Sequence, residues 1–125
     1  VGVAGAMPEF RIDASNSAAE QALQAGMHHD GMHFYPLPLG SRGSDHGLLA
    51  MNHEYADVRL MHPDEQKTWS AEKVAKSQAT VGVSVIEVRL EGGRWQVVRP
   101  SKYARRVHAR TPWGCPGRFR PWHGG

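Results

Sequence analysis

The chain has 125 residues, of which 40% are hydrophobic and 22% charged, a composition typical of a globular protein with one modest core. No run of about 18 apolar residues is present to span a membrane, and the single cysteine, Cys115, excludes an internal disulfide. The formal net charge is +3, but residues 113–125 hold Arg118 and Arg120 and no acidic residue, so the rest of the chain is close to neutral.

The first part of the chain predicts one short helix. In the stretch SNSAAEQALQAG, Ser15 or Ser17 is a candidate N-cap, and Glu20 stands three residues after Ser17, as in a capping box. Gly26 is a suitable end for this helix. The preceding residues, 8–16, have no periodic pattern and are expected to be irregular.

Two strands are predicted next, over residues 32–38 and 48–55. The first ends at its prolines, and the second begins with a continuous apolar run that suggests burial on both faces. Its end turns polar in the sequence NHEY. Because side chains alternate along a strand, Asn52 and Glu54 share one face and His53 shares the other with Tyr55.

The second half predicts a helix over residues 70–79, with Ser70 as N-cap, followed by a β-hairpin. The hairpin strands VGVSVIEVRL and RWQVVRP flank Glu91-Gly92-Gly93, whose glycines suit a turn with positive φ. Its first strand is expected to have an apolar face and a solvated face, the apolar residues being Ile86, Val88 and Leu90 and the solvated ones Glu87 and Arg89. In total, four strands and two short helices predict a mainly β fold.

Two polar clusters are candidates for chemistry. The first, in GMHHDGMHFYPLP, contains His28, His29, Asp30 and His33, whose imidazole and carboxylate groups are metal ligands. The second is the strand end with Asn52, His53 and Glu54, where a carboxylate and an amide can bind a cation and an anion. Neither matches a known metal-binding spacing, so a polar surface loop and a solvated strand end remain open alternatives.

Other classes of function have less support. No Ser-His-Asp arrangement and no glycine-rich phosphate loop is present in the sequence. Five basic residues gather near the end of the chain: Arg99, Lys102, Arg105, Arg106 and Arg110. They suit phosphate contacts, but a solvated strand and loop is the favoured explanation, and the near-neutral body disfavours a nucleic-acid partner.

Three stretches together resemble the PhoX-type alkaline phosphatase family over about residues 10–112. They are GMHHDGMHFYPLP, HGLLAMNHEY and EKVAKSQATVGVSVIEVRLEGGRWQVVRPSKYARRV, in this order and spacing. The resemblance implies a β-propeller, of which four strands supply about one blade or parts of two. It also implies export to the periplasm or outside, and hydrolysis of small phosphomonoesters with calcium and iron.

The resemblance also assigns roles to residues of the two clusters. It implies Asp30 and Glu54 as metal ligands, Asn52 as a contact to phosphate or metal, and His29 and His53 as weaker candidates. Asn52 and Glu54 are therefore the expected catalytic residues, and Asp30, Glu54 and His29 the expected metal ligands. Multivalent cations held in this way neutralise phosphoryl oxygens and activate an oxygen nucleophile.

The two ends of the chain depart from the family pattern. The start, VGVAGAMPEF, lacks the features of a signal peptide and suggests the interior of a longer protein. After Pro112 the expected continuation is replaced by WGCPGRFRPWHGG. The codons TGG GGC TGT CCG GGC CGG, read one base earlier after an A, encode Met-Gly-Leu-Ser-Gly-Pro, so we interpret residues 113–125 as a frameshifted and disordered tail.

The sequence thus predicts residues 1–112 to be a fragment of a PhoX-like propeller domain that is inactive by itself. The alternative is a non-catalytic propeller module with a binding or structural role.

Overall fold

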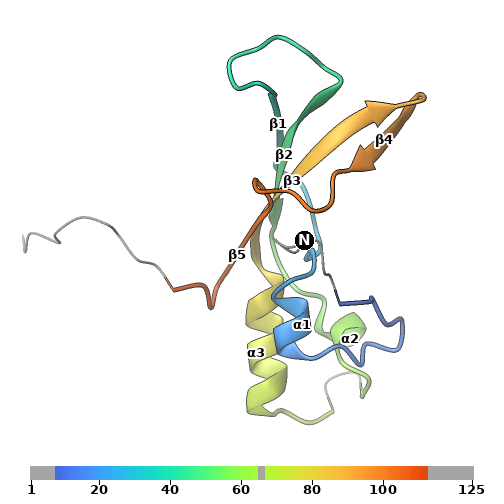
Figure 1. Ribbon diagram of the computed structural model, residues 1–125. Helices are drawn as coiled ribbons and strands as arrows, with labels where there is room; N and C mark the ends of the chain where they lie inside the picture. The colour runs from blue at the N-terminus through green and yellow to red at the C-terminus, as the bar shows by residue number, and fades with distance from the viewer. Residues whose placement is uncertain (1–7, 65–66, 113–125) are drawn as a thin grey trace, which may run out of the picture.

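One antiparallel sheet of five strands is the centre of the structure, and three short helices lie together at one end of it (Figure 1). The computed structural model describes residues 8–64 and 67–112. The strands are β1 (Met32–Pro36), β2 (His46–His53), β3 (Gly82–Glu91), β4 (Arg94–Val97) and β5 (Arg105–His108). The helices are α1 (Ala18–Gln21), α2 (Val58–Met61) and α3 (Ala71–Thr80).

Strand β3 organises the sheet because it pairs with three other strands. Along one edge it pairs with β2, from Gly82 opposite His53 to Arg89 opposite His46. Along the other edge, its first half pairs with β5 and its second half with β4. Strand β5 therefore lies beside the start of β3, on the edge opposite to the end of β2.

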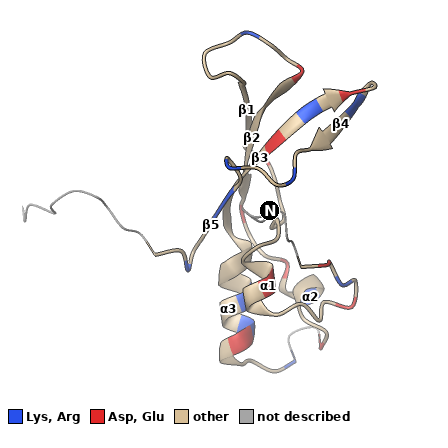
Figure 2. Cartoon of the chain, in the orientation of Figure 1, with Lys and Arg blue, Asp and Glu red and all other residues tan. Residues whose placement is uncertain are grey.

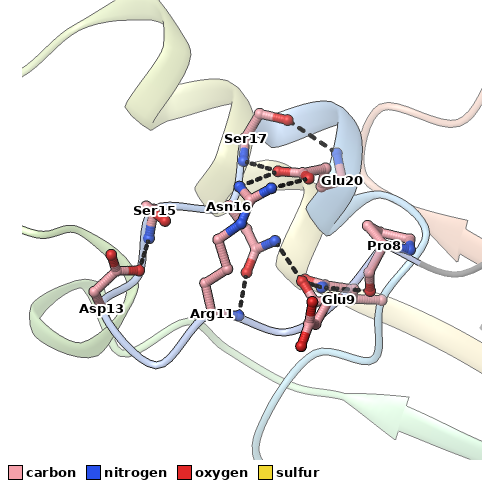
Figure 3. Close-up of polar contacts among 9 residues, drawn as sticks. Pro8, Glu9, Arg11, Asp13, Ser15, Asn16, Ser17 and Glu20 are labelled. Atoms are coloured by element: carbon pink, nitrogen blue, oxygen red, sulfur yellow. Dashed lines mark hydrogen bonds and ion pairs between the residues drawn. The ribbon is translucent and has the colours of Figure 1, made fainter.

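The helices begin where the sequence predicted. Ser70 accepts a hydrogen bond from the Lys73 amide at the start of α3, and Ser17 and Glu20 form a capping box at the start of α1. Figure 3 shows how the irregular segment before α1 is attached: Asn16 bridges the Arg11 amide and the Glu9 carbonyl. The segment therefore gains a defined path without regular secondary structure.

All four predicted strands and both predicted helices are present, and the structure adds α2 and β5. Helix α1 ends at Gln21, before Gly26. Helix α2 is a single turn capped by Asp57, too short to give a period of 3.6 residues. Strand β5 has the sequence RRVH, and it exists because it pairs with β3, a tertiary contact that a local pattern does not reveal.

The prediction that Glu87 lies on a solvated face of β3 is wrong, because Glu87 is buried. Its carboxylate accepts a hydrogen bond from the Ser101 hydroxyl, and its other oxygen lies 2.8 Å from His46 Nε2. These contacts lower the pKa of Glu87, the Ser101 hydrogen bond most of all. A carboxylate with two such partners is tolerated inside the protein, so alternation alone gives the wrong environment here.

The apolar start of β2 is only half-buried, because one face of the sheet is open. Phe34, Leu49, Val88 and Trp95, one from each of β1 to β4, line a hollow of about 360 Å³ on this face. The Phe34 and Trp95 rings meet edge to face across it, with centroids 5.9 Å apart. The expected burial on both faces of β2 is therefore not met in this chain.

Positive and negative charges are interspersed over the described residues (Figure 2). Both signs occur on α3 and on the hairpin of β3 and β4, and one member of the basic cluster, Arg106, is half-buried rather than solvated. Among the helices of residues 8–64 and 67–112, none has the length and apolar character that crossing a bilayer requires.

Candidate functional site

The two polar clusters predicted from the sequence lie against each other. The loop of residues 28–31, just before β1, runs beside the end of β2. The Asn52 amide donates to the Gly31 carbonyl at 3.0 Å, and the Glu54 amide donates to the His28 carbonyl at 3.2 Å. These hydrogen bonds continue the pairing with β2 to residues that precede the first residue of β1.

Asn52 connects the loop to the strand through its side chain. Its Oδ1 accepts hydrogen bonds from the amides of Asp30 and Gly31, at 3.1 and 2.9 Å. Its Nδ2 donates to Asp30 Oδ1. Because the two backbone amides are donors, the orientation of the Asn52 amide group is determined, and it holds both the loop and the Asp30 carboxylate.

Asp30 and Glu54 bring two carboxyl groups to this exposed edge. The hydrogen bond from Asn52 is the main reason why the pKa of Asp30 is lowered, and a hydrogen bond with Glu54 acts in the same direction. Asp30 is therefore ionised at neutral pH and suited to attract a cation.

The histidines of the loop have different neighbours. His28 has a positive φ of 59° and stacks on Tyr55, with ring centroids 3.9 Å apart. His29 Nδ1 lies 2.8 Å from the Asn52 carbonyl oxygen and 3.0 Å from His53 Nδ1. His33 belongs to β1 and lies against Tyr35, with ring centroids 4.5 Å apart.

His53 lies behind this edge and is buried. Its Nε2 is 2.6 Å from Ser84 Oγ, on the neighbouring strand β3. Burial lowers the pKa of His53 to about 4, and the nearby charge of Arg106 acts in the same direction. The imidazole is therefore neutral at physiological pH.

Arg106 and Ser84 support the site, and the sequence did not single out either for this role. The Arg106 guanidinium donates to the carbonyl oxygens of residues on four segments, Gln24, Ala79, Thr80, Val83 and Val107. Nothing in the sequence distinguishes this arginine from its neighbour Arg105, and Ser84 is one small residue inside a strand pattern. Both roles arise only from the tertiary arrangement.

The structure brings together Asp30, Asn52, Glu54 and His29, the four residues expected to form the site. No group of three His, Cys, Asp or Glu side chains positioned to hold a metal ion occurs within residues 8–64 and 67–112. The arrangement offers an ionised carboxylate, a second carboxyl group and an imidazole on one exposed edge. Carboxylates and imidazoles are of the kinds that bind cations, and the Asn52 amide beside them is a hydrogen-bond donor.

A family model and a solved structure match most of the chain. No curated protein sequence matches the chain. A solved structure, Pseudomonas fluorescens PhoX in complex with vanadate, a transition state analogue, is 40% identical with a TM-score of 0.73. The match covers 81% of this chain and 17% of the Pseudomonas chain, so the present chain spans about a sixth of that length.

The fold is therefore mainly antiparallel β and is consistent with part of a β-propeller-like PhoX fold. Segment 113–125, predicted to be a non-family tail, lies outside the described residues. The model of the family "Alkaline phosphatase PhoX" matches residues 2–120. The chain belongs to the PhoX alkaline phosphatase family.

Proposed function

We propose that this chain is part of a metal-dependent phosphomonoesterase that hydrolyses small phosphate monoesters. Membership of the PhoX alkaline phosphatase family supports this function. The observation that carries it is the Asp30 carboxylate, held by Asn52 beside the strand end whose backbone continues to Glu54. The similar Pseudomonas protein is in complex with vanadate, a transition state analogue, which supports a related activity for this chain.

The residues present suit a cation. Asp30 and Glu54 offer carboxylate oxygens, which calcium prefers, and His29 offers an imidazole nitrogen, which iron accepts alongside carboxylates. A bound cation would supply Lewis acidity, which stabilises negative charge on phosphoryl oxygens. We propose Asp30, Glu54 and His29 as ligands, and calcium and iron as the metals.

The chain's own polar groups orient the substrate. Asn52 Nδ2 carries two hydrogens, of which one is donated to Asp30. The second is the donor we assign to a phosphoryl oxygen. Glu54, one position beyond the end of β2, holds its carboxylate next to Asp30. Asn52 and Glu54 are thus the proposed catalytic residues.

The donors on this edge form part of a site, and we propose that the remaining donors come from other parts of a longer PhoX-type protein. The Pseudomonas chain is about six times the length that this chain matches. The isolated chain of 125 residues should therefore show little or no hydrolysis of a chromogenic phosphomonoester. We further propose a periplasmic or extracellular location, as for the family.

A chimera tests this function. In it, residues 8–112 replace the matching segment of Pseudomonas fluorescens PhoX, and hydrolysis of p-nitrophenyl phosphate is measured with calcium and iron present. We expect an active chimera, and a loss of kcat/KM of about 100-fold or more in Asp30→Asn and Glu54→Gln, since each removes a cation ligand.

Glu91→Gln in the same chimera is the matched control, because Glu91 is an exposed carboxylate at the hairpin turn, and it should retain full activity. A folded chimera that contains metal but has no activity would contradict the proposal and favour a non-catalytic propeller module. Calcium-dependent turnover by the isolated chain would contradict its predicted inactivity.

A further inference from the structure

His53 is an unusual residue to find in the interior of a sheet. It is only 2% exposed, although imidazole carries two polar nitrogens that need partners when buried. Both nitrogens have one: Nε2 lies 2.6 Å from Ser84 Oγ, and Nδ1 lies 3.0 Å from His29 Nδ1. The buried ring therefore connects the sheet interior to the exposed loop.

The Asn52 carbonyl oxygen determines which ring nitrogens of His29 and His53 carry a hydrogen. The Asn52 carbonyl oxygen accepts only, so His29 Nδ1, 2.8 Å away, must carry a hydrogen. His53 Nδ1 is then the acceptor of the contact between the two rings. A neutral imidazole with Nδ1 unprotonated carries its hydrogen on Nε2, and this hydrogen is donated to Ser84 Oγ.

Together, these contacts allow one tautomer of His29 and one tautomer of His53. Ser84 is fully buried and faces His53 from β3. The backbone at Gly26 also restricts His53, because a Cβ built on Gly26 would lie 2.7 Å from the His53 Cβ. The ring is held between strand and loop, and its Nδ1 lone pair is directed to His29.

We propose that His53 and Ser84 are positioning residues that hold His29 in its Nδ1–H tautomer and leave His29 Nε2 as the electron-pair donor to a cation. The role of the cation in this proposal rests on the proposed function, whereas the assignment of the His29 tautomer does not. A metal-binding histidine with its other nitrogen hydrogen-bonded to a backbone carbonyl is a common arrangement. In this chain, the buried histidine His53 makes a second contact with the same nitrogen of His29.

The wild-type chain of 125 residues tests the tautomers directly. Long-range ¹H–¹⁵N correlation spectra of the imidazoles are recorded at pH 8 without metal. We expect His29 to be protonated at Nδ1 and His53 at Nε2. The opposite tautomer at either ring would overturn the proposal, whether or not any variant folds.

The variant Ser84→Ala tests the buried partner. Without Oγ, the His53 Nε2–H has no acceptor, so the His53 Nδ1–H form gains population and displaces the hydrogen of His29. We expect His29 to become a mixture of tautomers, with tens of per cent protonated at Nε2. A His29 that remains fully Nδ1–H in a folded Ser84→Ala would overturn the role of Ser84.

Ser77→Ala is a matched control. Ser77 Oγ lies 3.2 Å from Nε2 of another buried histidine, His62, so this variant also removes a serine partner of a buried imidazole. The His29 spectrum should be unchanged in Ser77→Ala. An equal change in both variants would mean that the effect is a general loosening of the fold, and would overturn the specific role.

Zn²⁺ serves as the probe of the donor nitrogen. Wild type should show a shift of His29 Nε2 on titration, and Ser84→Ala should bind Zn²⁺ about twofold more weakly, because the fraction of His29 in the Nε2–H form cannot donate an electron pair from that nitrogen. Equal affinity in the two would overturn the consequence for binding. If wild type shows the expected tautomers but does not bind Zn²⁺, the result would support the positioning of His29 by His53 and Ser84. The same result would count against the metal role in the proposed function.

Discussion

Arg106 shows how much of the structure near the site depends on one half-buried charge. Its guanidinium donates five hydrogen bonds, to Gln24, Ala79, Thr80, Val83 and Val107. Two of these carbonyls end α3, where a helix has unpaired acceptors and favours a cation. Burial lowers the pKa of Arg106 to about 10, so the side chain remains charged at neutral pH.

Arg106→Met tests this role at the scale of the residue. Methionine keeps the length and apolar stem but leaves the carbonyl oxygens without their donor, which we expect to cost about 2–4 kcal/mol of unfolding free energy. Urea unfolding followed by circular dichroism measures the change. Arg110→Met, at an exposed position, should stay within about 0.5 kcal/mol, and equal values for the two variants would contradict the assignment.

At the scale of the element, the sequence was most informative where a local rule decides the structure. The caps at Ser17 and Ser70 and the turn at Gly92-Gly93 are local, and each lies where it was predicted. Strand β5 and the burial of Glu87 depend on segments far apart in the chain, so alternation and propensity did not reveal them.

The same division applies to the candidate site. The loop of residues 28–31 and the strand end were expected to form one site, and the structure places them together. Of the supporting residues, His53 contacts the loop directly from β2, whereas Ser84 lies on β3 and Arg106 on β5. Their roles depend on burial, which a single sequence without a three-dimensional fold does not specify.

Gly26 controls how the segment before the site packs on β2 and α3. A side chain there would meet the Thr80 carbonyl oxygen and would lie 2.7 Å from the His53 Cβ. The backbone oxygen cannot give way without moving the end of α3, so Gly26→Ala should force the loop outward. Glycine is thus required by close approach rather than by a positive φ.

We expect Gly26→Ala to cost about 2–3 kcal/mol of unfolding free energy, or to abolish the cooperative transition in a chain of low stability. Thermal unfolding measures it. The control is Gly43→Ala, where the nearest atom to the added Cβ, Asp45 Oδ1, is 3.4 Å away and the loop is exposed. A wild-type melting temperature for Gly26→Ala would show that the segment is not packed as described.

At the scale of the whole molecule, one face of the sheet is left open by the residues that the structure describes, 8–64 and 67–112. The hollow lined by Phe34, Leu49, Val88 and Trp95 is almost entirely apolar, and Trp95 is 52% exposed. Apolar surface that remains in water binds hydrophobic dyes and lowers solubility. The isolated chain should therefore bind the dye ANS while folded.

Trp95→Lys should reduce this dye fluorescence by at least half, because it removes the largest ring of the hollow and adds a charge. The loss of the Trp95 contact with Phe34 should cost only about 1 kcal/mol of unfolding free energy, so the fold is retained. Trp69→Lys is the matched control: Trp69 is 58% exposed and does not line the hollow, so dye binding should persist. Equal losses in the two variants would place the dye elsewhere, and the open face of the sheet would then not be the main apolar surface of the chain.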